Sequence, residues 1–172
     1  DNISYAKSRR ERVAKEYRDL EIRAIKVRTI GEVRSLLNRA KREKTYKIAP
    51  STYSEAQKKL AEADRFISTN PYAKEKMRAK AQAALFSAKR HLEIARVAKK
   101  LEAMEPEPIA LIMEKNLHDI ASKMQAPDMR DQDFKTQVEN IVGSAEALQY
   151  ERSAMLDKAK DQQNLTDSLQ SR

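Results

Sequence analysis

Two stretches decide the fold of this chain: TYSEAQKKLAEADRFI at residues 52–67 and MRAKAQAALFSAKRHLEIA at residues 77–95. Asn70-Pro71 stands between them. In both segments apolar residues recur every three or four positions, which places them on one face of a helix. These residues are Tyr53, Ala56, Leu60, Ala63 and Ile67, and then Met77, Ala81, Leu85, Ala88, Leu92 and Ala95. Because alanines allow close approach and the connection is short, the two segments predict an antiparallel helical hairpin.

Prolines divide the rest of the chain. Helix breaks are expected at Pro50, Pro71, Pro106/Pro108 and Pro127, because proline cannot continue a helix interior. The predicted helices span about residues 4–44, 52–68, 71–104, 108–125 and 130–165. Thr52 and Glu55 fit a capping box, and Asn70 is expected to cap the next helix with Pro71 in its first position.

The first predicted helix carries two apolar stripes in succession. The first is Val13, Tyr17, Leu20, Ala24 and Val27, and the second is Ile30, Val33, Leu37 and Ala40. Gly31 stands where the stripe shifts, which fits a bend, a close helix contact or a tolerated glycine. In the fourth helix, Met113, Leu117, Ile120 and Met124 are expected to face inward.

The composition supports an all-α fold without a thick core. The 172 residues include only two glycines and no tryptophan, 35% are charged, and the mean hydropathy is −0.81. Such a chain suits thin helical layers with a large solvated surface. We therefore expect an elongated antiparallel helical bundle or coiled coil of about five helices.

Charge separates the chain into two regions. Residues 1–104 hold 27 Lys and Arg against 13 Asp and Glu, whereas residues 105–172 hold 8 against 13. The expected organisation is a basic three-helix region at 1–104 and an acidic helical region at 108–172. A basic end can meet an anionic partner, and an acidic end cannot.

The last predicted helix has the clearest candidate interaction surface. Its apolar residues alternate in steps of four and three, as in a coiled-coil seam. The seam residues are Phe134, Val138, Ile141, Leu148 and Met155, with Ala145 and Ala159 at the same spacing and Arg152 interrupting them. We expect a protein partner or self-association along this seam.

A second candidate surface is basic. Two clusters of the first helix, Arg9, Arg10 and Arg12 and then Lys41, Arg42 and Lys44, could contact an anionic surface. A solvated helix face is the simpler interpretation, because acidic residues interleave with the basic ones. Nucleic acid is not the expected partner, since no aromatic stacking platform or binding motif accompanies the basic residues.

The chain lacks the motifs of an enzyme or a cofactor site. It has no cysteine, no glycine-rich phosphate loop and no Gly-x-Ser-x-Gly motif. Neither His91 nor His118 has a histidine at i±4 or a Glu three residues before it, so we expect surface or interface histidines. Helix capping explains Asp128, Asp131 and Asp133 better than calcium binding does. We expect no enzyme activity, no cofactor and no metal.

Residues 46–100 resemble the helical region that precedes the peptidoglycan-binding domain in some OmpA-family envelope proteins of Gram-negative bacteria. The shared stretches are YKIAPSTYSEAQKKLAEADRFI at 46–67, Asn70-Pro71-Tyr72, and ALFSAKR at 84–90. The pattern Ala-Pro-x-x-Tyr-x-x-Ala-x-x-x-Leu-x-x-Ala falls on Ala49, Pro50, Tyr53, Ala56, Leu60 and Ala63. The resemblance covers about a third of the chain.

The resemblance implies a periplasmic, outer-membrane-associated protein, with peptidoglycan bound only by a domain that this chain lacks. The Asp and Arg motif of that domain and a lipobox cysteine are both missing from this sequence. A cytoplasmic location stays open. Because the chain starts at Asp1 without Met and has a polar tail, we expect it to be part of a longer protein.

Two functions are consistent with these observations. The first is a non-enzymatic helical scaffold, spacer or protein-interaction module of the bacterial cell envelope. The alternative is a basic coiled-coil adaptor that binds nucleic acid or an anionic surface through its N-terminal half.

Overall fold

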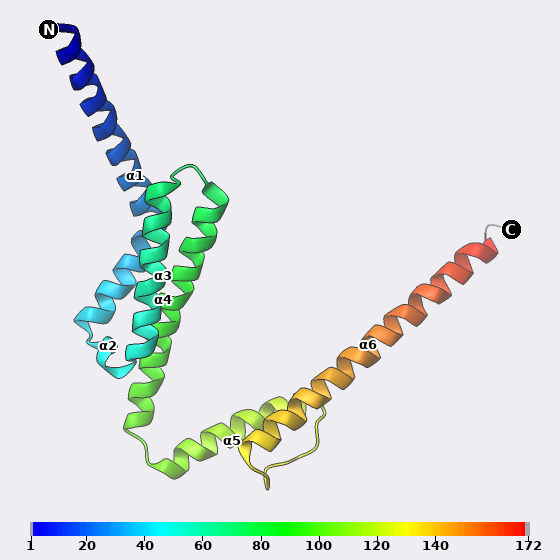
Figure 1. The fold of residues 1–172 in the computed structure, drawn as a ribbon. Helices are drawn as coiled ribbons and strands as arrows, with labels where there is room; N and C mark the ends of the chain where they lie inside the picture. The colour runs from blue at the N-terminus through cyan, green and yellow to red at the C-terminus, as the bar shows by residue number, and fades with distance from the viewer. Residues whose placement is uncertain (1, 171–172) are drawn as a thin grey trace. The chain divides into compact units, whose positions relative to one another are not determined.

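The computed structural model describes the backbone of residues 2–170 and the side chains of residues 5 and 7–169. Six helices and no strand occur in this range, so the prediction of an all-α protein is confirmed (Figure 1). They are α1 (Asn2–Arg42), α2 (Thr45–Ile48), α3 (Pro50–Thr69), α4 (Lys74–Glu102), α5 (Pro106–Lys123) and α6 (Phe134–Gln170). The helices form two compact units, residues 1–103 and 104–172.

The first unit is a three-helix bundle whose centre is the predicted antiparallel hairpin of α3 and α4 (Figure 1). Alanines line the contact: Ala56 and Ala63 on α3, and Ala84 and Ala88 on α4, have no exposed surface. Such small side chains let the two helices approach closely. The second half of α1 then covers the hairpin with the second apolar stripe, namely Ile30, Val33, Leu37 and Ala40, all of them buried.

Within the described part of the first unit, the first half of α1 has no helix beside it. Every side chain from Lys7 to Glu21 is exposed, including the stripe residues Val13, Tyr17 and Leu20. Val27, the last residue of this stripe, is exposed as well. Tyr72, in the turn between α3 and α4, donates a hydrogen bond to Glu21 and marks how far the hairpin reaches along α1. A Cβ added at Gly31 would meet no atom within 4 Å, so this glycine serves no close contact among the described residues.

The capping predicted at the starts of α3 and α4 is wrong, and α6 begins at Phe134 rather than near residue 130. Helix α3 begins at Pro50 with Ala49 as its N-cap, so Thr52 and Glu55 form no capping box. Thr52 instead donates its hydroxyl to the Ala49 carbonyl, and Glu55 pairs with Arg90 of α4. Glu55 thus takes a tertiary partner, and Thr52 a local carbonyl, in place of the reciprocal capping contacts.

Asn70 does not cap the helix that follows it. Its backbone N–H still donates to the Phe66 carbonyl and so completes α3. The chain then needs Pro71 to Ala73 for the turn, and α4 starts only at Lys74. The predicted break at residues 46–51 also contains structure, because Thr45–Ile48 form the short helix α2.

An ionic cluster holds α1 against α3. Lys26 Nζ lies 2.7 Å from a carboxylate oxygen of Asp64, and Arg34 binds the other oxygen. Partial burial raises the pKa of Asp64, but the hydrogen bond and charge of Lys26, reinforced by Arg34, outweigh it and lower the pKa below its usual value. The cluster therefore favours one register of α1 on the hairpin.

His91 is in the core, so the expectation of a surface or interface histidine is wrong for this residue. It has no exposed surface. The hydroxyl oxygen of Thr45 lies 3.0 Å from Nε2 of the imidazole, and that of Thr52 lies 3.0 Å from Nδ1. The Tyr53 ring packs edge-on against the imidazole, with 5.3 Å between the ring centroids. His91 therefore connects α4 to α2 and α3 at the end of the bundle where α1 turns back.

The second unit is a helical hairpin of α5 and α6 (Figure 1). Asp133 begins α6, because its carboxylate accepts hydrogen bonds from the Lys135 and Thr136 N–H groups. Asp128 lies in the preceding loop and receives the guanidinium of Arg130, whose hydrogen bonds lower the pKa of Asp128 to about 2. Of the three aspartates expected to serve the helix start, only Asp133 caps it.

We predict that Ala88→Leu lowers the free energy of unfolding of the three-helix unit by about 1–3 kcal/mol, because a larger side chain forces α3 and α4 apart. Urea denaturation followed by far-UV circular dichroism measures the change. Ala83→Leu is the matched control, since Ala83 is on the exposed face of α4. Its effect should stay within about 0.5 kcal/mol. Equal effects of the two substitutions would contradict the alanine contact.

We also predict that the melting temperature of the three-helix unit falls as the pH drops below about 6.5. Burial lowers the pKa of His91 below its ordinary value, although a hydrogen bond with Ala49 partly opposes this. The unfolded state then binds more protons than the folded state between the two pKa values, so stability is lost with decreasing pH.

His91→Gln should remove this pH dependence between pH 5 and 7, whereas His118→Gln should leave it unchanged. These two are the only histidines in the chain. Melting curves by circular dichroism at several pH values provide the measurement. A wild-type curve that is flat over this range would show that His91 does not titrate differently in the folded state.

Candidate interaction surfaces

The contact between α5 and α6 is narrow. Leu117 and Ala121 of α5 meet Gln137, Asn140 and Ile141 of α6 around a small cavity of about 10 Å³. The side-chain amide of Gln137 is buried and donates to the Gln132 carbonyl at 2.8 Å. The face of α6 that touches α5 is therefore offset from the predicted seam, although it includes Ile141.

The second unit has almost no core of its own. Among the described residues from 104 onward, only Ala121 and Gln137 are buried. An amphipathic helix is stabilised mainly by burying its apolar stripe against another element. The contact between α5 and α6 does this for only a small part of either stripe.

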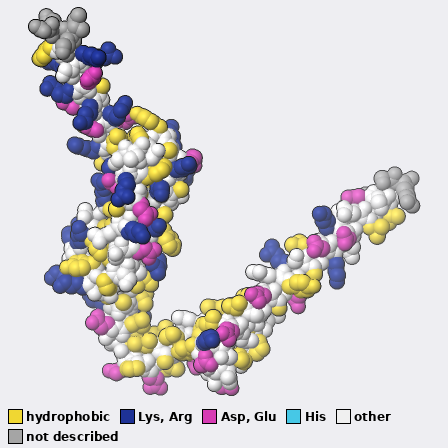
Figure 2. Space-filling view, in the orientation of Figure 1, with side chains coloured by type: hydrophobic (Ala, Val, Ile, Leu, Met, Phe, Trp, Pro, Cys, Tyr) yellow, Lys and Arg dark blue, Asp and Glu magenta, His cyan; other side chains and the backbone are white. Residues whose placement is uncertain are grey.

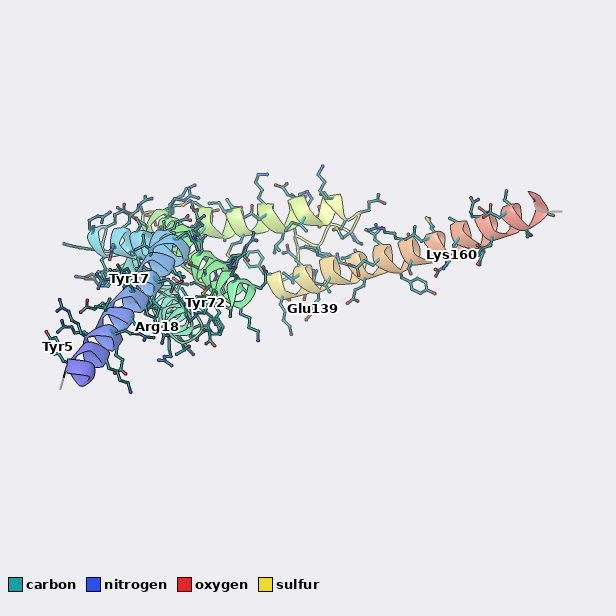
Figure 3. The ribbon with its side chains drawn as sticks, turned by 90° about the horizontal axis from the view of Figure 1, so that it is seen from above. Tyr5, Tyr17, Arg18, Tyr72, Glu139 and Lys160 are labelled. Atoms are coloured by element: carbon teal, nitrogen blue, oxygen red, sulfur yellow. The ribbon has the colours of Figure 1, made fainter. Side chains whose placement is uncertain are left out.

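The structure leaves most of the predicted seam uncovered. Val138 is 45% exposed, Leu148 38% and Met155 68%, and Phe134 is also at the surface. Ile141 is half-buried under α5. From residue 151 to 169 every side chain of α6 except the half-buried Ala154 is exposed (Figure 3 shows Lys160 in this part and Glu139 nearer the start of the helix).

Helix α5 adds further exposed apolar residues. Met113 and Ile120 were expected to face inward but are about half exposed, while Leu117 and Met124 are half-buried. The reason is that α6 offers a partner on one side only. Exposed apolar residues of α5 are Leu111, Ile112, Met113 and Ile120. Figure 2 shows hydrophobic side chains gathered over α5 and the start of α6.

The six predicted basic contacts fall into two clusters. Arg9, Arg10 and Arg12 lie on the exposed first half of α1. Among the described residues, Arg12 alone of the three forms an ion pair, with Glu16 at 3.9 Å. Lys41, Arg42 and Lys44 are exposed at the other end of α1 and form no ion pair among the described residues. About 30 residues of helix place the two clusters roughly 45 Å apart. They are not one patch.

The described residues contain no group of three or more histidines and carboxylates placed to hold a metal ion. A groove of the first unit, about 640 Å³ between α1 and α3, combines apolar Leu37 and Leu60 with Arg34, Asp64 and Arg65. Asp64 is already bound by Lys26 and Arg34. No described helix is long and apolar enough to cross a membrane.

Sequence reasoning missed Gln137 and His91, although spacing marks both. Gln137, Ile141 and Ser144 follow steps of four and three, and Ala84, Ala88, His91 and Ala95 follow four, three and four. In each case a polar residue occupies a buried position of a helical stripe. A search that used periodicity without regard to polarity would have found them.

Comparisons of this chain with protein-family models, curated proteins and solved structures find no match. None of them links residues 46–100 to envelope proteins of the OmpA family, and that resemblance stays a prediction. The candidate surfaces therefore rest on the geometry of this chain alone.

Proposed function

We propose that this protein is a non-enzymatic helical scaffold that holds a protein partner along the seam of α6. The observation that carries the proposal is the contrast between the two units. The first unit buries the stripes of α3, α4 and the second half of α1 in a core of its own, and the second leaves Val138, Leu148 and Met155 exposed. A partner helix on the seam would supply the missing burial.

The geometry also suits a spacer. The 37 residues of α6 span about 55 Å, and only the first part of the helix meets α5. The three-helix unit would act as a rigid body because its core and its ionic cluster both join α1 to α3. A location in the bacterial cell envelope, and membership of a longer protein, are parts of the proposal that rest on the resemblance of residues 46–100.

The test of the proposal is photo-crosslinking in cells that express the full chain. Met155 and Tyr150 are similarly exposed, at 68% and 78%, but only Met155 is in the seam. Replacing Met155 with p-benzoylphenylalanine should yield a crosslinked protein adduct, and replacing Tyr150 should yield none or far less. Leu148→Asp should abolish the adduct, because it places an unpaired charge in the apolar contact.

Absence of any adduct from the Met155 position would contradict the proposed function. Equal adducts from the two positions would also contradict it, because they would indicate contact without preference for the seam. The mass of the adduct distinguishes a second copy from a foreign protein.

A second candidate function, binding to an anionic surface, is favoured by the unpaired cations at the end of α1. Lys41, Arg42 and Lys44 have no acidic partner among the described residues. Figure 2 shows Lys and Arg side chains over much of the first unit. Basic residues near an anionic membrane contribute about 1 kcal/mol each.

The triple variant Lys41→Gln, Arg42→Gln, Lys44→Gln should then weaken binding to vesicles that contain phosphatidylserine by about 10- to 100-fold. The control variant Lys135→Gln, Lys158→Gln, Lys160→Gln removes three charges from α6 and should change the affinity little. Co-sedimentation at two salt concentrations measures both, and binding should weaken as salt rises. Salt-independent binding, or equal losses in both variants, would argue against this function.

A further inference from the structure

The seam of α6 can pair with its own copy. Seam positions from Phe134 to Ala159 are separated by four and three residues, so two α6 helices can mesh along them as a coiled coil. In a two-fold symmetric dimer the same surface serves both copies, and it must be complementary to itself. The sequence of the seam decides in which direction this works.

Arg152 excludes the parallel arrangement. It occupies a seam position and forms no ion pair among the described residues. In a parallel, in-register pair it would face Arg152 of the other copy, which places two like charges in the contact. In an antiparallel pair it faces an apolar residue, and its long stem can cover that residue while the guanidinium reaches water.

One antiparallel register uses nearly the whole seam. Its two-fold axis passes between Glu146 and Ala147, and large residues then meet smaller or flexible ones. In the successive layers, a residue of one copy faces a residue of the other: Phe134 faces Ala159, Val138 faces Met155, Ile141 faces Arg152, and Ala145 faces Leu148. Shifting one copy by two heptads would bring Gln162 and Thr166 into the contact, so this register buries more apolar surface.

Charges beside the seam do not oppose this register. Beside the seam, a residue of one copy is again paired with a residue of the other: Lys135 with Leu156, Gln137 with Lys158, Val142 with Gln149, and Ser144 with Glu151. None of these pairs brings two like charges together. The surface therefore meets the requirement for self-complementarity.

The available area is also of the right size. The seam from residue 134 to 159 is about 39 Å long, and α5 adds about 27 Å of a second helix beside it. With each helix about 10 Å across, the face measures roughly 650 Å² in flat projection, which undercounts the ridged surface. Stable protein interfaces bury about 800 Å² per partner.

We propose that two copies of this chain pair through α6, antiparallel, and that the two hairpins of α5 and α6 complete a four-helix bundle. Exposed Met113 and Ile120 of α5 would become part of its core, as facing positions do in such bundles. The inference rests on the proposed function, because it names the partner of the seam.

Sedimentation equilibrium of the purified full chain should give about twice its mass of 19.8 kDa. Leu148→Asp should raise the dissociation constant at least about 100-fold, since each dimer would bury two unpaired carboxylates. Tyr150→Asp is the control and should leave the dimer intact, because Tyr150 is on the opposite side of α6 from the seam and is 78% exposed.

Cysteine crosslinking tests the direction of pairing, and the chain has no cysteine to interfere. Gln149 and Gln163 are both exposed and occupy equivalent positions two heptads apart. In the antiparallel register the two copies of residue 149 are offset by only about 7.5 Å along the axis, and those of residue 163 by about 50 Å. With a short bis-maleimide, Gln149→Cys should therefore crosslink to a dimer, and Gln163→Cys should not.

The possible failures are distinguishable. A chain that is monomeric at all concentrations overturns the dimer. If photo-crosslinking from the Met155 position then captures a foreign protein, the proposed function survives. If it yields no adduct, both proposals fail. A dimer in which both cysteine variants crosslink equally is parallel and overturns the antiparallel pairing.

Discussion

The close contact between α3 and α4 is the interaction on which the first unit depends. Alanines at Ala56, Ala63, Ala84 and Ala88 let the helices approach, so backbone and short side chains pack where large residues would hold them apart. The second half of α1 covers the resulting surface with larger side chains, Ile30 and Val33. His91 closes one end with two threonine hydroxyls, which satisfies both nitrogens of a buried imidazole.

The second unit follows the opposite plan. The hairpin of α5 and α6 buries little of either apolar stripe, because the face of α6 that meets α5 is offset from the seam. The contact that does form uses Gln137 and Ile141, offset from the seam, and so keeps Val138 and Leu148 available. The pattern is that of a binding surface rather than of a self-sufficient fold, and it supports the proposal of a scaffold that completes its core by association.

The exposed first half of α1 adds a third element. Its stripe from Val13 to Val27 has coiled-coil spacing but is flanked by arginines and glutamates, in contrast to the sparsely charged flanks of the α6 seam. Flanking charges of this kind set partner choice and orientation in coiled coils. The two exposed stripes therefore differ in what they can accept, and the α6 seam is the one suited to its own copy.

The sequence by itself determined the all-α class, the hairpin at residues 50–102 and the stripes of α1 and α6, because helical periodicity and proline breaks are local properties. It did not determine which stripe would be covered. Val13 to Val27 and Ile30 to Ala40 have the same spacing, yet only the second is buried. In the first unit the hairpin does not extend beside residues 7–20, and Val27 is beside the hairpin but faces away from it, so it is 64% exposed. Tertiary contacts also put polar His91 and Gln137 inside. Burial depends on which elements lie alongside a stripe, and that is decided only when the chain folds.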